Sequence, residues 1–550
     1  MRVRLPYKPK PDNYTESCMV DVADRWRERS VWYLGRSAWY ASKGVTTAES
    51  GAERAEVSRG HSSGKTVKGR INRSSKYNPE RRKEHMNTEN AENGGCSQRN
   101  SAEHKKYVRA HRSFNRIWKE RNSAEPDLLG KVLTKENLNS AYKRVKANKG
   151  APGVDGMTVE EALPWLKEHR NELIGRIRSG HYTPQPVRRV EIPKPDGGVR
   201  KLGIPTVVDR IIQQGIAQQL MPIYEPLFSD GSYGYRPGRS AKDAIRKIKE
   251  YAEQGYTRAV VLDLSRYFDT INHEKLVNLL RENVKDERVI QMIKRYLKSG
   301  VMENGVVTET KEGSPQGGNL SPLLANVYLN EFDQEFKRRG VPCIRYADDI
   351  VLLARSERAS ERLLESSVKY LEQTMKLKVN REKSRTVSVF AIRNFKYLGF
   401  CFGKGRSGVF VRVHAKSWKK IKDNLRALTS RSRCGSIVGA MKRITVVMRG
   451  WLNYYGIADM KNNIETLNGW LYRRIRMCIW KQWKLPKTRK RKLVGLGVAE
   501  HYAATIAYDR KGYWFNANNK AVKWALNKER LIRWGFYDLT TAYQSMHESC

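Results

Sequence analysis

The chain has 550 residues, 39% of them hydrophobic, which is enough to bury substantial cores and to form several domains. Its 105 Lys and Arg residues outnumber its 57 Asp and Glu residues, and the resulting net charge of +48 indicates a polyanionic partner, nucleic acid foremost. The seven cysteines form no C-x-x-C pair, which excludes a disulfide scaffold and a paired-cysteine zinc site. Without a signal core or a stretch that could span a bilayer, the sequence predicts a cytoplasmic protein with no membrane partner.

Residues 1–124 differ in composition from the rest of the chain. They are rich in Ser, Gly, Asn and charged residues and follow neither hydrophobic period, apart from a short helix expected within residues 21–32. Such a segment buries too little apolar surface to offset its ordering entropy. We therefore predict a basic, disordered N-terminal extension.

From about residue 127, helical and strand patterns alternate, and Gly and Pro residues separate them. A helix is expected around residues 138–145, followed by a Gly-rich loop at 149–156. Residues 187–205 predict two strands around a turn at 194–198, where the sequence Lys-Pro-Asp-Gly-Gly favours a hairpin. A long amphipathic helix at 207–224 and a buried strand at 260–264 follow.

Three aspartates in this region carry the chemistry. Asp348 and Asp349 stand in a Tyr-Ala-Asp-Asp sequence between two apolar runs, which predicts two strands joined by a tight acidic turn. Asp263 ends a third apolar run. Together these carboxylates could hold two Mg²⁺ ions for phosphoryl transfer, since hard oxygen ligands suit magnesium. Taken singly, each segment also has an ordinary interpretation, as a turn pair or a helix cap.

After residue 403 the charge balance shifts again. Residues 404–492 contain 24 Lys and Arg residues but only three acids, Asp423, Asp459 and Glu465. Between Leu471 and Lys484 the apolar residues fall on one helical face, with arginines elsewhere on the cylinder. The sequence therefore predicts a helical, strongly basic region that can bind structured RNA through its phosphates.

Seven co-linear motifs resemble the reverse transcriptases encoded by group II introns, over about residues 127–550. They are 149–156 (Lys-Gly-Ala-Pro-Gly-Val-Asp-Gly), 192–198 (Ile-Pro-Lys-Pro-Asp-Gly-Gly), 233–237 (Tyr-Gly-Tyr-Arg-Pro), 313–322 (Gly-Ser-Pro-Gln-Gly-Gly-Asn-Leu-Ser-Pro), 346–349 (Tyr-Ala-Asp-Asp), 397–400 (Tyr-Leu-Gly-Phe) and 449–455 (Arg-Gly-Trp-Leu-Asn-Tyr-Tyr). The resemblance implies an α+β right-hand polymerase fold, with fingers and palm at 125–403. A helical thumb and maturase domain would follow at 404–485, and a short basic C-terminal region at 486–550.

The resemblance also assigns roles to residues. Asp263, Asp348 and Asp349 match the catalytic ligands of two Mg²⁺ ions. Five residues match the dNTP-binding set, namely Lys194, Arg200, Phe268, Gln316 and Lys383. Among them, Phe268 matches the aromatic gate against the ribose 2′-hydroxyl. Gly399 matches a turn that contacts the primer.

The implied function is RNA-directed DNA polymerisation on intron RNA, with assistance to splicing and retrohoming. The implied partners are the group II intron RNA, an RNA template with a DNA primer, dNTPs and target DNA, with association to the nucleoid when DNA is engaged. Five basic residues of the maturase region are candidate RNA contacts, namely Arg449, Arg473, Arg474, Arg476 and Lys481. Because no paired cysteines follow Lys492, we expect the short, class C-like form without an H-N-H endonuclease, which takes its primer from elsewhere.

Two alternatives remain open at this stage. An RNA-binding splicing factor with an inactive polymerase would keep the basic surface, although the intact aspartates argue against it. Residues 1–124 could be translated intron sequence, selected for the structure of the RNA and not for a protein fold. Alternatively, they could be a basic arm that binds RNA.

Overall fold

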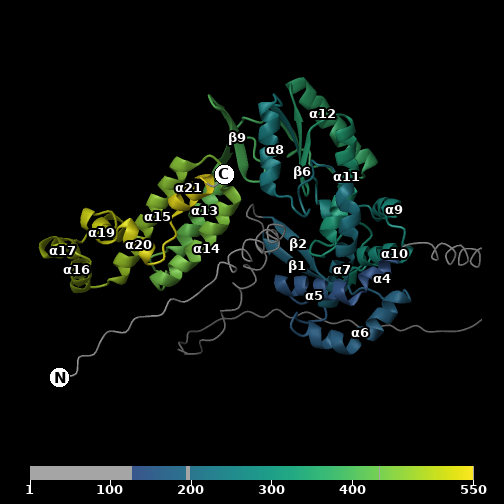
Figure 1. The fold of residues 1–550 in the computed structure, drawn as a ribbon, viewed down its shortest axis with the longest axis horizontal. Coiled ribbons are helices and arrows are strands. Elements are labelled where there is room, and N and C mark those ends of the chain that lie inside the picture. Colours follow the sequence, from purple (N-terminus) through teal and green to yellow (C-terminus); the bar gives the residue numbers. More distant parts are fainter. Residues whose placement is uncertain (1–126, 194–197, 433, 549–550) are drawn as a thin grey trace, which may run out of the picture. The chain divides into compact units, whose positions relative to one another are not determined.

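The computed structural model describes residues 127–193, 198–432 and 434–548. From Leu128 onward these residues belong to one compact unit (Figure 1). The extension predicted at 1–124, with its helix at 21–32, and residues 194–197 of the turn predicted at 194–198 lie outside the described residues. Among the helices described, none combines the length and apolarity needed to cross a bilayer.

The first part of the described chain combines helices with a small sheet. Its helices are α4 (Leu128–Val132), α5 (Lys135–Asn148), α6 (Ala162–Arg178) and α7 (Val207–Tyr224), and its strands are β1 (Val187–Pro193), β2 (Val199–Ile204), β4 (Val301–Glu303) and β5 (Val306–Thr308). The sheet has the order β2-β1-β4-β5, with β1 and β2 antiparallel as predicted. Helix α7 has the predicted bounds and begins at the cap Thr206, whose side chain accepts a hydrogen bond from the Asp209 N–H.

A second sheet, with the order β6-β7-β3-β8, carries the predicted acidic turn. Its strands are β3 (Arg258–Leu262), β6 (Cys343–Tyr346), β7 (Asp349–Ala354) and β8 (Arg385–Ser388). The surrounding helices are η2 (Glu225–Leu227), α8 (Ala241–Glu253), η3 (Tyr267–Asp269), α9 (His273–Asn283), α10 (Glu287–Leu297), α11 (Ser321–Arg338), α12 (Glu357–Lys369) and η4 (Tyr370–Thr374). In Figure 1, α8, α11 and α12 flank this sheet.

Strand periodicity divides the residues of this sheet between two cores. Val260, Leu262 and Leu352 pack with α11 and the helices near it, while Ala259, Val351 and Leu353 pack with α8 and the C-terminal elements. Because both faces are covered, the central strands β3 and β7 are mainly apolar. The sheet is thus a rigid support for residues at its ends.

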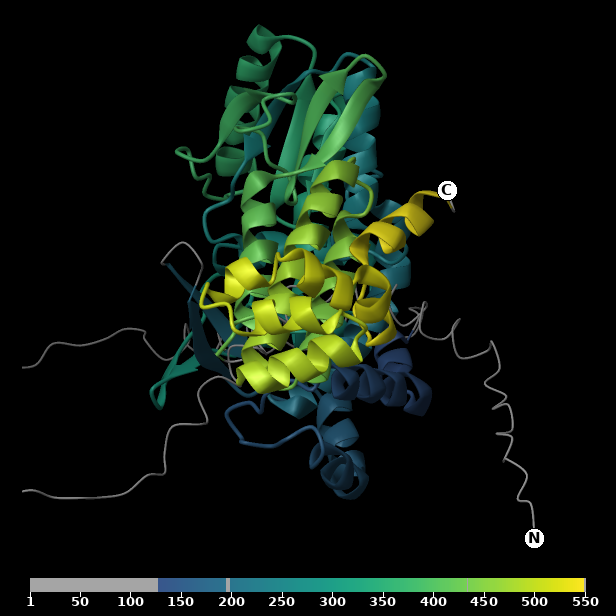
Figure 2. The ribbon, with the colours of Figure 1, turned by 90° about the vertical axis from the view of Figure 1, so that its left-hand side faces the viewer.

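The remainder begins with a hairpin, β9 (Phe400–Gly405) and β10 (Gly408–Val413), so the boundary predicted at 403/404 cuts through β9. Helices follow, shown in green to yellow in Figure 2. They are α13 (Ala415–Leu428), α14 (Ile437–Tyr455), α15 (Lys461–Gln482), α16 (Pro486–Gly495), α17 (Glu500–Ala507), α18 (Tyr513–Asn516), α19 (Lys520–Ala525), α20 (Lys528–Arg533) and α21 (Leu539–Glu548). As predicted, the apolar face of α15 is buried, whereas Lys484 lies beyond its end.

Candidate functional site

The acidic turn is a two-residue hairpin between β6 and β7. Tyr346 pairs with Asp349, so Ala347 and Asp348 are its central residues. Ala347 has a φ of 60°, whereas the φ of Asp348 is not positive. This combination is found in type II′ hairpin turns. A positive φ in a residue with a side chain stores backbone strain, which tends to occur at functional sites.

Asp263 lies beside this turn because of strand register. In the antiparallel pair of β3 and β7, Leu262 faces Ile350, so the next residues along each strand are Asp263 and Asp349. The Asp263 N–H donates to Ser384 Oγ at 3.0 Å, and its carbonyl accepts from the Asn380 N–H at 2.8 Å. The ends of two neighbouring strands thus present carboxylates at the same place.

These carboxylates influence one another electrostatically. Burial, followed by the charges of Asp348 and Asp263, raises the pKa of Asp349 to about 7. Burial also raises the pKa of Asp348, and the Asp263 carboxylate adds to this rise while the Arg200 guanidinium opposes it. Asp349 is exposed on one side, while the surrounding protein atoms remove water from its other sides and so raise its pKa. Carboxylates held in such proximity favour either a proton or a cation.

A magnesium site agrees with the donor chemistry of this turn. Carboxylate oxygens are the ligands that Mg²⁺ prefers, and the mutual repulsion of these groups is what a divalent cation would relieve. Within the described part of the chain, however, no three His, Cys, Asp or Glu side chains already form a cluster that could hold a metal ion. The three aspartates are therefore adjacent without being drawn together around one point.

Two more groups approach the turn from other segments. Arg200 of β2, an exposed residue, lies close enough for its charge to act on Asp348. Tyr235 has a φ of 58°, and burial, followed by the charge of Asp348, raises the pKa of its hydroxyl. Tyr235 belongs to the motif at 233–237, but no role for it was predicted from the sequence. Lys194, also expected here, lies outside the described residues.

Phe268 and Gln316 are joined through one loop. Phe268 is half-buried in η3, and its carbonyl accepts a hydrogen bond from the Ser314 N–H at 2.6 Å. Two residues further on, the Gln316 carbonyl accepts from the Gly203 N–H of β2 at 2.8 Å. Gly317 has a φ of 133°, and a Cβ there would lie 2.4 Å from the Gly203 carbonyl oxygen. The loop thus connects the proposed sugar gate to the strand that carries Arg200.

Lys383 lies next to the acidic turn, with its Nζ 3.8 Å from Oδ2 of Asp263. Gly399, with a φ of 87°, follows Leu398 in the turn before β9, and its carbonyl accepts from the His414 N–H at 3.0 Å. Hydrogen bonds connect this turn to α14 and to β7. Tyr454 Oη of α14 donates to the Leu398 carbonyl at 3.0 Å, and Tyr397 Oη donates to the Asp349 carbonyl of β7 at 3.2 Å.

Three of the five candidate RNA contacts donate hydrogen bonds to backbone carbonyls of the same chain. Arg473 donates to the Trp514 carbonyl, Arg474 to the Thr429 carbonyl, and Arg476 to the Leu526 carbonyl. Sequence alone could not reveal these partners, which lie far along the chain. Arg449 and Lys481 are exposed, although each lies over a tyrosine ring, Tyr537 and Tyr513 respectively.

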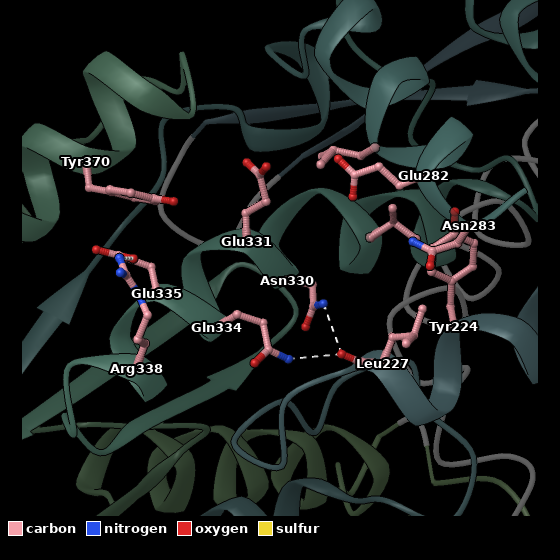
Figure 3. Close-up of a pocket in the computed structure, with 12 residues that line it drawn as sticks. Tyr224, Leu227, Glu282, Asn283, Asn330, Glu331, Gln334, Glu335, Arg338 and Tyr370 are labelled. Carbon is pink, nitrogen blue, oxygen red and sulfur yellow. Dashed lines mark hydrogen bonds and ion pairs between the residues drawn. The ribbon is translucent and has the colours of Figure 1, made fainter.

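A cavity of about 560 Å³ lies elsewhere in the described part of the chain. It is bounded by residues of α7, η2, α9, α11 and η4, and its lining includes Glu282, Glu331, Glu335 and Arg338 (Figure 3). Asn330 and Gln334 both donate to the Leu227 carbonyl at its base. No residue of the predicted site lines it, and two of its glutamates are ion-paired, Glu331 with Lys275 and Glu335 with Arg338 and Arg339.

Comparison with known proteins identifies the family of the chain. Residues 192–402 match the family model described as reverse transcriptase (RNA-dependent DNA polymerase), and residues 418–494 match that of the group II intron maturase-specific domain. Protein YkfC of Escherichia coli (strain K12) is 35% identical over 298 residues, which cover 47% of this chain and 78% of that protein. The chain belongs to the group II intron-encoded reverse transcriptases.

A further relative of this family is the group II intron-encoded protein LtrA of Lactococcus lactis subsp. cremoris. It is 42% identical over 196 residues, which are 35% of this chain and 32% of LtrA, so the match spans about a third of that relative. Among solved structures, the partial Cas6-RT-Cas1–Cas2 complex aligns at 24% identity over 44% of this chain and 42% of that chain, with a TM-score of 0.29. The α+β fold is that expected of a reverse transcriptase.

Proposed function

We propose that this chain is an RNA-directed DNA polymerase that extends the 3′ hydroxyl of a primer along an RNA template, with intron RNA as its natural template. Asp263, Asp348 and Asp349 would be the ligands of two Mg²⁺ ions. The observation that carries the proposal is the register of β3 and β7, which makes Asp263 and Asp349 neighbours at the end of two strands. Bound there, the ions would stabilise the attacking and leaving oxygens of phosphoryl transfer.

Cationic side chains around the turn suit the binding of a triphosphate. Arg200 acts electrostatically on Asp348, and Lys383 lies beside Asp263. We infer that both donate to phosphate oxygens of the incoming nucleotide and stabilise the charge that develops during transfer. Lys194, which lies outside the described residues, would join them.

Selection of the sugar would rest on Phe268 and Gln316. Their loops are hydrogen-bonded through Ser314, and the Gln316 carbonyl is fixed to β2. An aromatic ring held in this way can exclude a ribose 2′-hydroxyl by its volume. We therefore expect dNTPs to be preferred over rNTPs. Gly399 would contact the primer from the turn before β9.

The helical region would bind intron RNA and assist its splicing. We take residues 125–403 as fingers and palm, the following elements to about 485 as thumb and maturase domain, and 486–550 as a short basic C-terminal region. Arg449 and Lys481 are the exposed members of the predicted RNA contacts. The partners would be the intron RNA and, during retrohoming, target DNA, with the primer supplied from elsewhere.

The decisive experiment is primer extension on an RNA template, with dNTPs and rNTPs in separate reactions. Wild type is compared with Asp348→Asn, with and without Mg²⁺. We expect dNTP incorporation by wild type that requires the metal and is lost in the variant. Equal extension by both proteins would contradict the proposal. Intron RNA binding without any extension by wild type would instead indicate a splicing factor with an inactive polymerase.

A further inference from the structure

Arg345 is a fully buried arginine directly before the acidic turn. It stands in the short apolar strand β6 and is 0% exposed, as is usual only for an arginine whose charge is paired. Its Nε and Nη2 donate to the carboxylate of Asp333 on α11, the closer contact being 2.6 Å. Asp333 is 1% exposed, so the ion pair is inaccessible to water.

The remaining N–H groups of Arg345 reach three other residues. Nη2 also donates to Ser232 Oγ at 2.8 Å, and Nη1 donates to Asn326 Oδ1 at 2.9 Å. The second Nη1 bond goes to the carbonyl oxygen of Ala347, at 3.0 Å. All five donors of the guanidinium are therefore used, and one of them holds the acidic turn itself.

Asn326 and the Arg345 carbonyl also hold the backbone of Tyr233 and Gly234 against the turn. Asn326 Nδ2 donates to the Gly234 carbonyl at 2.7 Å, and the Tyr233 N–H donates to the Arg345 carbonyl at 2.8 Å. A Cβ on Gly234 would lie 2.3 Å from the backbone nitrogen of Ala347, so only glycine fits there. The turn thus rests on a surface that Arg345 and its partners hold in place.

The bond to the Ala347 carbonyl has a specific consequence for the turn. Types I′ and II′ differ in the orientation of the peptide between the two central residues, and type I′ requires a positive φ at the second of them. Here that residue is Asp348, and aspartate tolerates a positive φ better than most residues do. A donor fixed on the Ala347 oxygen prevents this peptide from turning over.

We propose that Arg345 is a positioning residue that fixes the orientation of the Ala347–Asp348 peptide and thereby the placement of the Asp348 carboxylate. The inference rests on the proposed function, because the role of that carboxylate is to bind metal. A buried ion pair alone stabilises a fold little more than apolar residues of similar volume would. What apolar residues could not replace is the donor on the Ala347 carbonyl oxygen.

Arg345→Lys tests the proposal, since lysine keeps the charge near Asp333 but cannot serve five directions from one nitrogen. Asp286→Asn is the control for lost stability, because Asp286 is a buried hydrogen-bonded carboxylate of another segment, at the start of α10. For each protein we would measure the single-turnover rate of dNTP addition, the KM for dNTP, and Mn²⁺ affinity by electron paramagnetic resonance without nucleic acid. All values are compared at equal concentration of folded protein.

We expect Arg345→Lys to lower the single-turnover rate about 100-fold and to weaken Mn²⁺ binding about 10-fold, with little change in KM, because a misplaced ligand affects the reacting centre most. The control should match wild type in rate and metal affinity. If Arg345→Lys does not fold, Arg345→Gln with Asp333→Asn removes both buried charges together and should show the same losses.

Two results would overturn the inference. One is an Arg345→Lys protein with the rate and Mn²⁺ affinity of wild type. The other is a loss that the Asp286→Asn control reproduces in full. Failure of the proposed function looks different, because wild type itself would then show no metal-dependent extension, or Asp348→Asn would be as active as wild type.

Discussion

Nζ of Lys383 lies 3.8 Å from Oδ2 of Asp263, and both side chains are largely open to solvent, at 66% and 41% exposure. An exposed pair of this kind contributes little to stability. The pair matters for function because Asp263 lies beside the acidic turn. If a cation takes over the Asp263 carboxylate, the ammonium group becomes available to a nucleotide phosphate.

Lys383→Ala should therefore lower the efficiency of dNTP incorporation by about 10- to 100-fold, because a cationic donor to the triphosphate is lost. Steady-state primer extension over a range of dNTP concentrations measures the effect. Lys369→Ala, which removes another exposed lysine at the end of α12, is the matched control. Equal losses in both variants would refute a specific role for Lys383.

Phe268→Ala should weaken discrimination between dNTP and rNTP by about 10- to 200-fold, the range that a hydrophobic pocket supplies through steric fit. Phe268 is half-buried on η3, so truncation opens space without removing a central core residue. The ratio of kcat/KM values for dCTP and CTP on the same primed template measures it. An unchanged ratio would show that another group excludes the 2′-hydroxyl.

Gly399→Ala should destabilise the protein for two separable reasons. Its φ is 87°, and a new Cβ would lie 2.5 Å from the Tyr455 hydroxyl oxygen. Gly238→Ala is a control for φ alone, since its φ is 71° and nothing lies within 4 Å of a Cβ there. We expect a loss of about 1 kcal/mol for the control and a larger one for Gly399→Ala.

Adding Tyr455→Phe to Gly399→Ala should recover part of the loss, because the clashing oxygen is removed while the φ strain remains. Thermal unfolding of the four proteins, with Tyr455→Phe alone completing the cycle, gives the interaction energy between the two sites. Strict additivity would contradict the predicted contact between the turn before β9 and helix α14.

Asp286→Asn should lose more stability at neutral than at acid pH. Burial acts to raise the pKa of Asp286, but hydrogen bonds from Arg288 and the Leu129 N–H outweigh it, and the net pKa is lowered. A carboxyl with a lowered folded-state pKa contributes stability above its unfolded pKa, about 3.9, and this is lost as pH falls through the folded value.

We therefore expect Asp286→Asn to cost about 1 to 3 kcal/mol at pH 7, and the gap from wild type to narrow progressively below about pH 4. Unfolding in urea across this pH range measures it. Asp423→Asn, which breaks an exposed pair with Arg426, should differ little from wild type at any pH. A gap that does not change with pH would mean that Asp286 acts through shape rather than charge.

Elements whose sequence signal lies within the segment itself were predicted best. Helix α7 was predicted with its observed bounds, because its apolar period and its cap at Thr206 are contained in the segment. The strand predicted at 260–264 lies instead at Arg258–Leu262, since after Leu262 the chain leaves the ladder with β7 and Leu264 only bridges Val379. Strands β4 and β5, of three residues each, were not predicted.

Partners distant in sequence were beyond prediction. Arg345 of β6 had no role predicted from the sequence, and nothing local identified Asp333 or the Ala347 carbonyl as its partners. The same limit applies to Arg473 and Arg476, whose predicted RNA contacts stay a prediction and whose hydrogen bonds to carbonyls of the C-terminal helices could not be predicted. Charge patterns indicate the kind of partner, whereas only the fold reveals which donors remain for it.

The most direct test of the account is to locate metal ions at the acidic turn. Crystals of the protein with primed RNA template, a non-hydrolysable dNTP and Mn²⁺ would be measured at the manganese absorption edge. The account predicts two anomalous peaks roughly 3.5–4 Å apart, with Asp263 and at least one of Asp348 and Asp349 bound to a common ion. Peaks that Asp263 does not share, or no peak at this turn, would contradict it.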